Sequence, residues 1–257
     1  MDQSPVRVAV VGADASLRSR VRQVVEDAGG YLVDRAEADA LVAVGAETVG
    51  EAIRARVSQT AASDAADNRP IVVPVVDRND TLGTAVLTAV ERLLAGETCH
   101  VEHPVLSVDG KSVTARAALD IAVVTDEPAQ IAEYAIERPD SRLTSVRADG
   151  VVVATPLGSR GYAAAVDGPR LDAGAGLAVV PIAPFSTRKP VWVVDGGVTV
   201  GLERGDGAVA LVVDGTRHVS VKPGETVDIE IAGRIAVASP VGSNPPAHTD
   251  RKGSNNS

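Results

Sequence analysis

The first third of the chain alternates between short apolar runs and segments whose apolar residues recur at helical intervals. The apolar runs are rich in β-branched residues, which is typical of strands buried on both faces of a parallel sheet. Strands that alternate with helices of this length predict an α/β domain with right-handed crossovers. The predicted strands cover residues 6–12, 41–45 and 71–76, and the predicted helices cover residues 16–28, 82–94 and a stretch that ends near residue 57.

After Gly96 the pattern changes to short β-branched runs separated by Gly, Pro, Asp and Asn, which predicts antiparallel sheets in a sandwich or barrel-like arrangement. A polar, aperiodic stretch over residues 58–69 predicts a loop. We therefore expect an α/β domain over residues 1–98, an all-β domain over residues 99–238 and a disordered tail over residues 239–257, with a ligand site between the two domains. The predicted β strands cover residues 119–124, 151–154, 177–182, 191–194, 198–202, 208–213, 227–231 and 235–237.

The composition limits the possible classes of protein. Of the 257 residues 45% are hydrophobic but only 2% are aromatic, so the core must be built from Val, Ala, Leu and Ile. The single cysteine, Cys99, excludes an internal disulfide framework and a cysteine-ligated zinc or iron–sulfur site. No run approaches the about 18 apolar residues of a membrane span, and the first residues do not resemble a signal peptide. We expect a soluble, cytoplasmic protein that does not bind membranes.

The net charge of −9 argues against non-specific binding to nucleic acid or anionic lipid. Acidic residues are abundant, lysine is scarce, and Ala and Val are frequent. Such a composition is typical of a halophilic protein, and a GC-rich genome also produces it. Both explanations stay open.

Residues 147–169, with the sequence RADGVVVATPLGSRGYAAAVDGP, contain the most informative pattern. A turn at Asp149-Gly150 leads into a strand, and the segment from Thr155 to Tyr162 leaves that strand and enters a helix. Gly158 and Gly161 allow close backbone approach, and N–H groups at a helix start favour an anion or ribose hydroxyls. A glycine-rich turn without any ligand would look the same.

Several motifs in series resemble the NAD kinase family. In order along the chain they are LLAGE (93–97), DG (149–150), TPLGSRGY (155–162), DGP (167–169), PIAPFSTRKP (181–190) and VVDGTRHVSVKPGETVDI (212–229). The resemblance covers residues 36–237 and is densest over residues 147–190. It implies a Rossmann-like N-terminal domain and a β-sandwich C-terminal domain. It also implies the reaction of ATP with NAD to give ADP and NADP, with Mg²⁺, and assembly into dimers or tetramers. The chain looks like a divergent member of archaeal or halophilic character.

The chain departs from the family pattern where the chemistry is expected. The family's GGDGT loop matches residues 44–48, which places Ala46 at the acidic position and Glu47 at the following glycine. Alanine cannot accept a proton, and Glu47 is a possible substitute. The family's Asn-Glu pair falls on Asp120-Ile121, and residues 77–80 stand where the family has a glycine-rich segment. Within the other motifs, family residues are replaced by Leu157, Arg160, Gly161, Phe185 and Thr216.

Two functions are compatible with these residues: an NAD kinase of doubtful competence, or a catalytically silent regulatory protein that binds NAD or an adenine nucleotide. No residue is identified as catalytic with certainty. His100 and His103 have a spacing that can bind a metal, but no third ligand is evident, so we expect a solvated pair and no metal site. The resemblance and the glycine-rich pattern predict that NAD or ATP contacts Gly45, Asp120, Arg147, Asp149, Gly150, Thr155, Gly158, Arg160 and Tyr162.

Overall fold

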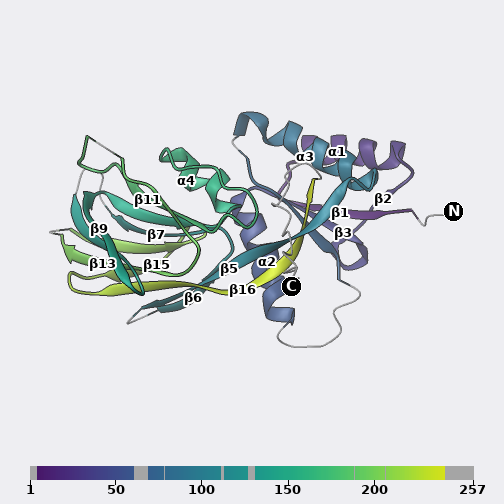
Figure 1. Ribbon diagram of the computed structural model, residues 1–257. Helices are drawn as coiled ribbons and strands as arrows, with labels where there is room; N and C mark the ends of the chain where they lie inside the picture. The colour runs from purple at the N-terminus through teal and green to yellow at the C-terminus, as the bar shows by residue number, and fades with distance from the viewer. Residues whose placement is uncertain are drawn as a thin grey trace, which may run out of the picture.

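A computed structural model gives the structure of residues 5–60, 69–77, 79–110, 113–126, 131–187, 189–205 and 207–240. The chain forms a parallel sheet covered by helices, followed by two antiparallel sheets that face each other (Figure 1). The predicted fold class is confirmed. Within the described ranges no helix is long and apolar enough to cross a membrane.

The N-terminal sheet has the strand order β2-β1-β3-β4, with every pair parallel. Helices α1 and α3 lie on one of its faces and α2 on the other (Figure 1). Side chains alternate between these faces along each strand, so Val8 and Val10 pack toward α1 and α3, whereas Ala9 packs toward α2. The elements are β1 (Arg7–Val11), α1 (Ala15–Asp27), β2 (Tyr31–Leu32), the 3₁₀ helix η1 (Arg35–Glu37), β3 (Ala40–Val44), α2 (Ala46–Thr60), β4 (Ile71–Val75) and α3 (Asn79–Leu94).

Two boundaries differ from the prediction. Helix α2 continues to Thr60, so the first residues of the predicted loop over 58–69 are helical, while residues 61–68 lie outside the described part. Helix α3 starts at Asn79, within the segment 77–80 that replaces the family's glycine-rich segment.

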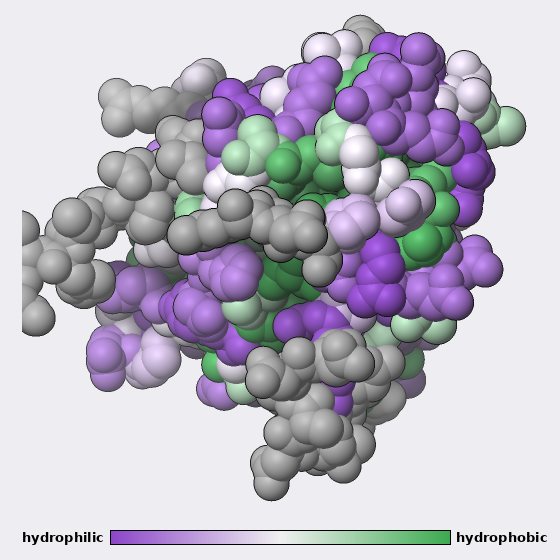
Figure 2. Space-filling view, turned by 90° about the vertical axis from the view of Figure 1, so that its right-hand side faces the viewer, coloured by the Kyte–Doolittle hydropathy of each residue, from purple (hydrophilic) through white to green (hydrophobic). Residues whose placement is uncertain are grey.

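Viewed from the end that carries the N-terminal sheet, hydrophilic residues cover most of the surface and hydrophobic residues gather near its centre (Figure 2).

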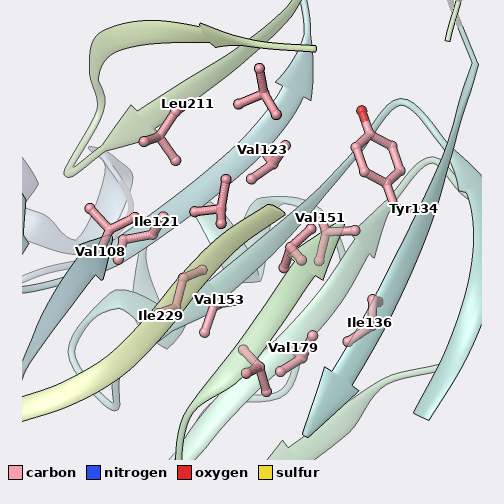
Figure 3. Close-up of a cluster of buried hydrophobic side chains, with 14 of the residues drawn as sticks. Val108, Ile121, Val123, Tyr134, Ile136, Val151, Val153, Val179, Leu211 and Ile229 are labelled. Carbon is pink, nitrogen blue, oxygen red and sulfur yellow. The ribbon is translucent and has the colours of Figure 1, made fainter. Parts of the chain in front are cut away.

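The C-terminal part consists of two six-stranded antiparallel sheets with the orders β12-β11-β10-β7-β14-β15 and β6-β5-β16-β13-β8-β9. Valine, leucine and isoleucine side chains from both sheets meet in one core, which also holds the fully buried ring of Tyr134 (Figure 3). The elements are β5 (Thr98–Gly110), β6 (Val113–Ala117), β7 (Asp120–Thr125), β8 (Ala132–Arg138), β9 (Ser141–Ala148), β10 (Gly150–Ala154), the 3₁₀ helix η3 (Gly158–Arg160), α4 (Tyr162–Ala165), β11 (Leu177–Ile182), β12 (Trp192–Val194), β13 (Val198–Arg204), β14 (Val209–Val213), β15 (Thr216–Val221) and β16 (Thr226–Pro240).

Strands β5 and β16 form a long ribbon that runs from the β-sandwich to the N-terminal sheet (Figure 1). The two strands predicted at 227–231 and 235–237 are therefore one strand, interrupted only by a bulge between Ile231 and Gly233. The ribbon packs into both cores of the N-terminal sheet, through Val237 on the α2 side and Ala238 on the α1 and α3 side. The first residues of the predicted tail, 239 and 240, belong to β16, and residues 241–257 lie outside the described part.

Candidate functional site

The carboxyl ends of the parallel strands form one wall of the candidate site. Gly12 follows β1 and Gly45 follows β3, with φ angles of 80° and 85° that favour glycine. A Cβ on Gly12 would lie 2.2 Å from the carbonyl oxygen of Val44, so these two loops touch. The N–H of Gly45 donates to the carbonyl oxygen of Val75 at 2.9 Å, which joins the third loop to the same edge. In open α/β sheets this edge is where ligands bind.

The loop between β3 and α2 carries Ala46 and Glu47, the residues that replace the family's Asp-Gly. Helix α2 begins directly at Ala46, and both side chains are exposed. Consecutive residues of a helix point in directions about 100° apart, so the Glu47 carboxylate does not project where an acid at residue 46 would. Glu47 also lies in the first turn of α2, where a negative charge stabilises the helix dipole.

Asp120 lies in the other domain, at the first position of β7. Ile121 and Val123 face the sandwich core, so Asp120 lies on the other face together with Ala122, which packs against α4. Asp120 is buried, and among the described residues its side chain makes no hydrogen bond or ion pair. Burial, with a smaller contribution from the charge of Asp214, raises the pKa of Asp120 to about 7.

Asp214 holds the start of β7 in place from the turn between β14 and β15. Its carboxylate oxygens accept hydrogen bonds from the backbone N–H groups of Ala118 at 2.9 Å, Leu119 at 2.7 Å and Asp120 at 3.2 Å. Asp214 also forms an ion pair with Arg54 of α2. One buried carboxylate therefore connects the start of β7, the β14–β15 turn and the helix of the other domain.

The turn that follows β10 is built by internal hydrogen bonds. The hydroxyl of Thr155 is fully buried and donates to the carbonyl oxygens of Ala118 at 3.1 Å and Leu119 at 2.9 Å. A Cβ on Gly158 would lie only 2.1 Å from the Leu119 carbonyl oxygen, so glycine is required there. Ser159 is also buried and accepts the N–H of Leu171 at 2.9 Å. Thr155 and Gly158 thus shape the turn. The Thr155 hydroxyl and the space where a Cβ of residue 158 would lie both face other protein atoms.

Arg160 and Tyr162 emerge from this turn toward the interface between the domains. Tyr162 is 42% exposed at the start of α4. Partial burial, with smaller contributions from the charges of Asp120 and Asp149, raises the pKa of the Tyr162 phenol. Gly161 lies against Val76 of the parallel sheet, because a Cβ there would contact Val76 at 3.7 Å.

A cavity of about 460 Å³ lies between the two domains, within the size range of small-molecule sites. Residues 73–77 and helix α3 form one side, and residues 156, 157 and 160 of the TPLGSRGY turn form another. Asp77 lines the cavity and pairs weakly with Arg170, with 3.9 Å between Oδ1 and Nη2. The cavity thus lies beside the segment where the family's glycine-rich residues are missing.

His103 lines the same cavity and is not solvated, contrary to the expectation. The ring is only 3% exposed, and its Nε2 lies 2.7 Å from the carbonyl oxygen of Ala118. Burial lowers the pKa of His103 to about 4, so the ring is neutral at pH 7. Within the described ranges no group of three His, Cys, Asp or Glu side chains could hold a metal ion.

The remaining predicted residues, Arg147, Asp149 and Gly150, lie where β9 ends and β10 begins. Arg147 is exposed, and its guanidinium carbon lies 5.9 Å from the centre of the Phe185 ring, a cation–π distance. Asp149 accepts the backbone N–H of Thr125 through its carbonyl oxygen at 2.8 Å. A Cβ on Gly150 would lie 2.6 Å from the Val123 carbonyl oxygen, so Gly150 allows close strand packing. Of the nine residues predicted to contact the nucleotide, Arg160 lines the interdomain cavity and the other eight do not.

Comparisons with known proteins point to one family. Residues 118–241 match the family model of the ATP-NAD kinase C-terminal domain. The chain is 33% identical over 117 residues to the NAD kinase of Methanosarcina acetivorans, covering 44% of this chain and 42% of that protein. It is 32% identical over 154 residues to the NAD kinase of Thermoplasma acidophilum, covering 58% and 55%. The matches span about half the length of these curated relatives.

Two solved structures share the whole fold. One is yeast NADH kinase complexed with NADH, with a TM-score of 0.63, 14% identity, and coverage of 94% of this chain and 86% of that chain. The other is an NAD kinase from Archaeoglobus fulgidus in complex with ATP, with a TM-score of 0.53, 22% identity and coverage of 90% and 93%. The fold thus defines a protein with an α/β domain, a β-sandwich and a cleft between them. Residues 118–241 thus match the C-terminal domain of the NAD kinase family, and the fold of the chain resembles that of these two kinases.

Sequence reasoning missed three residues of the site. Asp214 belongs to a motif that was recognised, but its role as an acceptor for three backbone N–H groups carries no sequence signal. Arg54 lies 160 residues from its partner Asp214, and nothing in the helical pattern distinguishes it from other exposed arginines. The expectation that His103 is solvated rests on its spacing from His100, and this spacing carries no information about burial.

Proposed function

We propose that this chain binds an adenine nucleotide or dinucleotide in the cleft between its domains, and that it phosphorylates NAD far more slowly than intact members of its family. One observation carries the proposal. The β3–α2 loop keeps its place at the carboxyl edge of the parallel sheet but offers Ala46 where the family has its acid. The groups that shape the cleft are retained, and the group that accepts a proton is lost.

Binding is supported by the cavity of about 460 Å³ and by the groups around it. Arg160 provides a cation at the rim for phosphate, and Arg147, stacked on Phe185, is the weaker candidate. Tyr162 offers an exposed ring and a hydroxyl for a base or ribose. The relatives of known structure were crystallised with NADH and with ATP, which is the ligand class proposed here.

Magnesium in phosphoryl transfer is held by one or two carboxylates together with substrate phosphates. Ala46 supplies no oxygen ligand, and the described residues contain no cluster that could hold the ion by themselves. The residues fit a magnesium site poorly, so we assign no step to it. This again favours binding over catalysis.

Asp120 supports a second candidate, a true NAD kinase that uses a different base. A general base works best when its pKa lies near the operating pH, and the pKa of Asp120 is about 7. In that case the 2′-hydroxyl of NAD would give its proton to Asp120 while its oxygen attacked the γ-phosphorus of ATP and ADP departed. Glu47 is the weaker substitute, because it is exposed in the first turn of α2.

One experiment separates these functions. Purified protein is titrated calorimetrically with NAD, NADH, NADP and ATP, and NADP formation from ATP, NAD and Mg²⁺ is measured in parallel. Both are done at low and at multimolar salt, because the acidic, lysine-poor composition is typical of proteins that fold only in concentrated salt. Binding with a turnover far below the usual enzyme range of about 1–10³ s⁻¹ supports the proposal. Turnover within that range that is lost in Asp120→Asn identifies the second candidate.

We further propose that the chain forms a dimer or tetramer through its β-sandwich and acts in the cytoplasm, where ATP and NAD are found. Phe185 is 73% exposed and Val193, on the edge strand β12, is 52% exposed. An unpaired sheet edge with exposed apolar residues favours pairing with another chain. Light scattering of the wild type and of Val193→Lys tests the assembly.

A further inference from the structure

A second cavity lies where α2, β6 and the bulged part of β16 meet. Its volume is about 410 Å³, and it is lined by residues 56 and 57 of α2, Arg116 of β6, two residues of β5 and residues 232–236 of β16. It is separate from the interdomain cavity except for Glu102, which lines both. None of the nucleotide contacts predicted from the sequence lies among its lining residues.

Positive charge is concentrated in this cavity although the whole chain carries a net charge of −9. Arg56, Arg116 and Arg234 come from three different elements and all line it, and Glu102 is the single acidic residue among the described lining residues. Within the part of the chain that the structure describes, the side chains of Arg116 and Arg234 form no hydrogen bond or ion pair. Three converging guanidinium groups form a site for an anion.

Arg56 is held at the edge of the cavity and lies near further positive charge. Its Nη1 donates to the carbonyl oxygen of Pro70 at 2.6 Å, which fixes the half-buried side chain at the cavity. Burial and the positive charge of Arg69 both lower the pKa of Arg56. The charge of Arg234 likewise acts to lower the pKa of His103 behind the ribbon. The surroundings of Arg56 are thus positive, and an anion bound in the cavity would be attracted to them.

The bulge in β16 opens the cavity and directs Arg234 to it. The register between β16 and β5 shifts between Ile231 and Gly233, directly before Arg234. Bulges redirect side chains in this way. A Cβ on Gly233 would have no atom within 4 Å, so the space in front of the bulge is open. Val57, Val105 and Ile235 give the same cavity an apolar lining.

We propose that this cavity is a second ligand site, distinct from the nucleotide cleft, and that it binds a small organic phosphate with an apolar group. The phosphate would be held by Arg116 and Arg234, whose planar guanidinium groups match phosphate oxygens in pairs. The apolar group would pack on Val57 and Ile235. The size of the cavity favours a small molecule over a polymer.

The test uses phenyl phosphate, inorganic phosphate and benzyl alcohol as probes. Binding to the full chain is followed by the amide signals of residues 233 and 234 in NMR spectra. Phenyl phosphate is expected to bind more tightly than either of the other two, because only this probe has both the charge and the apolar group. The variant Arg116→Gln/Arg234→Gln should weaken its binding at least ~10-fold, about 1.4 kcal/mol. Gly233→Val, which fills the open space without changing charge, should also weaken binding.

The control variant Arg20→Gln/Arg138→Gln removes the same charge from exposed positions on α1 and β8 and should leave binding unchanged. Melting temperatures establish that each variant is folded. The proposal is overturned if phenyl phosphate does not shift the signals, or if the control weakens binding as much as the test variant. Arg160→Gln distinguishes the two sites, because it should weaken nucleotide binding without affecting phenyl phosphate. Failure of nucleotide binding alone leaves the second site supported.

Discussion

Arg54 of α2 and Asp214 of the β14–β15 turn form an ion pair across the interface between the two domains. The Asp214 side chain is completely buried and also accepts three backbone N–H groups at the start of β7, whereas the Arg54 side chain is 32% exposed. The same contact thus orients the helix that follows the Ala46 loop and the strand that carries Asp120. One buried carboxylate therefore connects the two domains.

Removing the two partners should have unequal effects. Asp214→Ala leaves three buried N–H groups without an acceptor and removes the carboxylate that pairs with Arg54, and should destabilise the fold by about 3–5 kcal/mol. Arg54→Met leaves the carboxylate with its backbone donors and should cost about 1–3 kcal/mol. Urea unfolding measures both. The control is Arg142→Met, which breaks an exposed pair with Glu203 and should cost less than about 1 kcal/mol. Equal losses for Asp214→Ala and the control would contradict this account.

Asp120 should make the protein less stable as the pH rises. The folded-state pKa of about 7 lies above the unfolded value of about 4, so between these pH values the unfolded chain loses the proton first. The free energy of unfolding therefore falls by up to about 4 kcal/mol from pH 4 to pH 7 on account of this group. Asp120→Asn lacks this loss, so its stability advantage over wild type should grow across that range. An advantage that is independent of pH would sink the assignment.

His103 should act in the opposite direction. Its folded-state pKa of about 4 lies below the unfolded value of about 6.5, so the unfolded chain gains the proton first as the pH falls. This contribution to stability is complete above pH 6.5 and about 3 kcal/mol of it is lost by pH 4. His103→Gln should remove that dependence. Its stability relative to wild type should therefore increase as the pH falls, whereas that of Asp120→Asn increases as the pH rises. Titration of the His103 ring signal near pH 6.5 would show that the ring is solvated after all.

Restoring the family's loop tests whether it alone limits catalysis. Ala46→Asp/Glu47→Gly returns the acid and removes a side chain and a charge from the phosphate path. If this loop alone differs, NADP formation should rise by at least ~10²-fold. We expect a smaller rise, because Asp120-Ile121 and Arg160-Gly161 still differ and catalytic groups act as a unit. Glu47→Gly alone is the control. A loss from a fast wild-type rate would identify Glu47 as the base.

Two neighbouring glycines should respond differently to alanine. Gly158→Ala places a Cβ 2.1 Å from the Leu119 carbonyl oxygen, and the strain should cost about 1–3 kcal/mol or more. Gly161→Ala, which restores the family's residue, gives ordinary contacts of 3.5 Å or more and should be tolerated. Thermal unfolding and nucleotide binding of both variants provide the comparison. A destabilised Gly161→Ala with an unchanged Gly158→Ala would contradict the described turn.

The sequence predicted the parts of this fold that are locally encoded. The strand predicted at residues 177–182 coincides with β11, because β11 is an unbroken apolar run buried on both faces. Strands β5, β6, β8, β9 and β15 were not predicted, since histidine and charged residues interrupt their apolar pattern on the exposed side. Within the site, the Gly158 turn was recognisable from its residues. The Arg54–Asp214 pair and the burial of His103 depend on tertiary packing, which no local pattern records.

The β5–β16 ribbon has a consequence for how the protein is made. The α/β domain leaves the ribosome first, yet Val237 and Ala238, which complete its two cores, are among the last residues of the described chain to be synthesised. Until then the exposed apolar surface of that domain has to be protected during translation. A ribosome stalled before β16 should carry a protease-sensitive N-terminal half, and release of the full chain should make both halves resistant together.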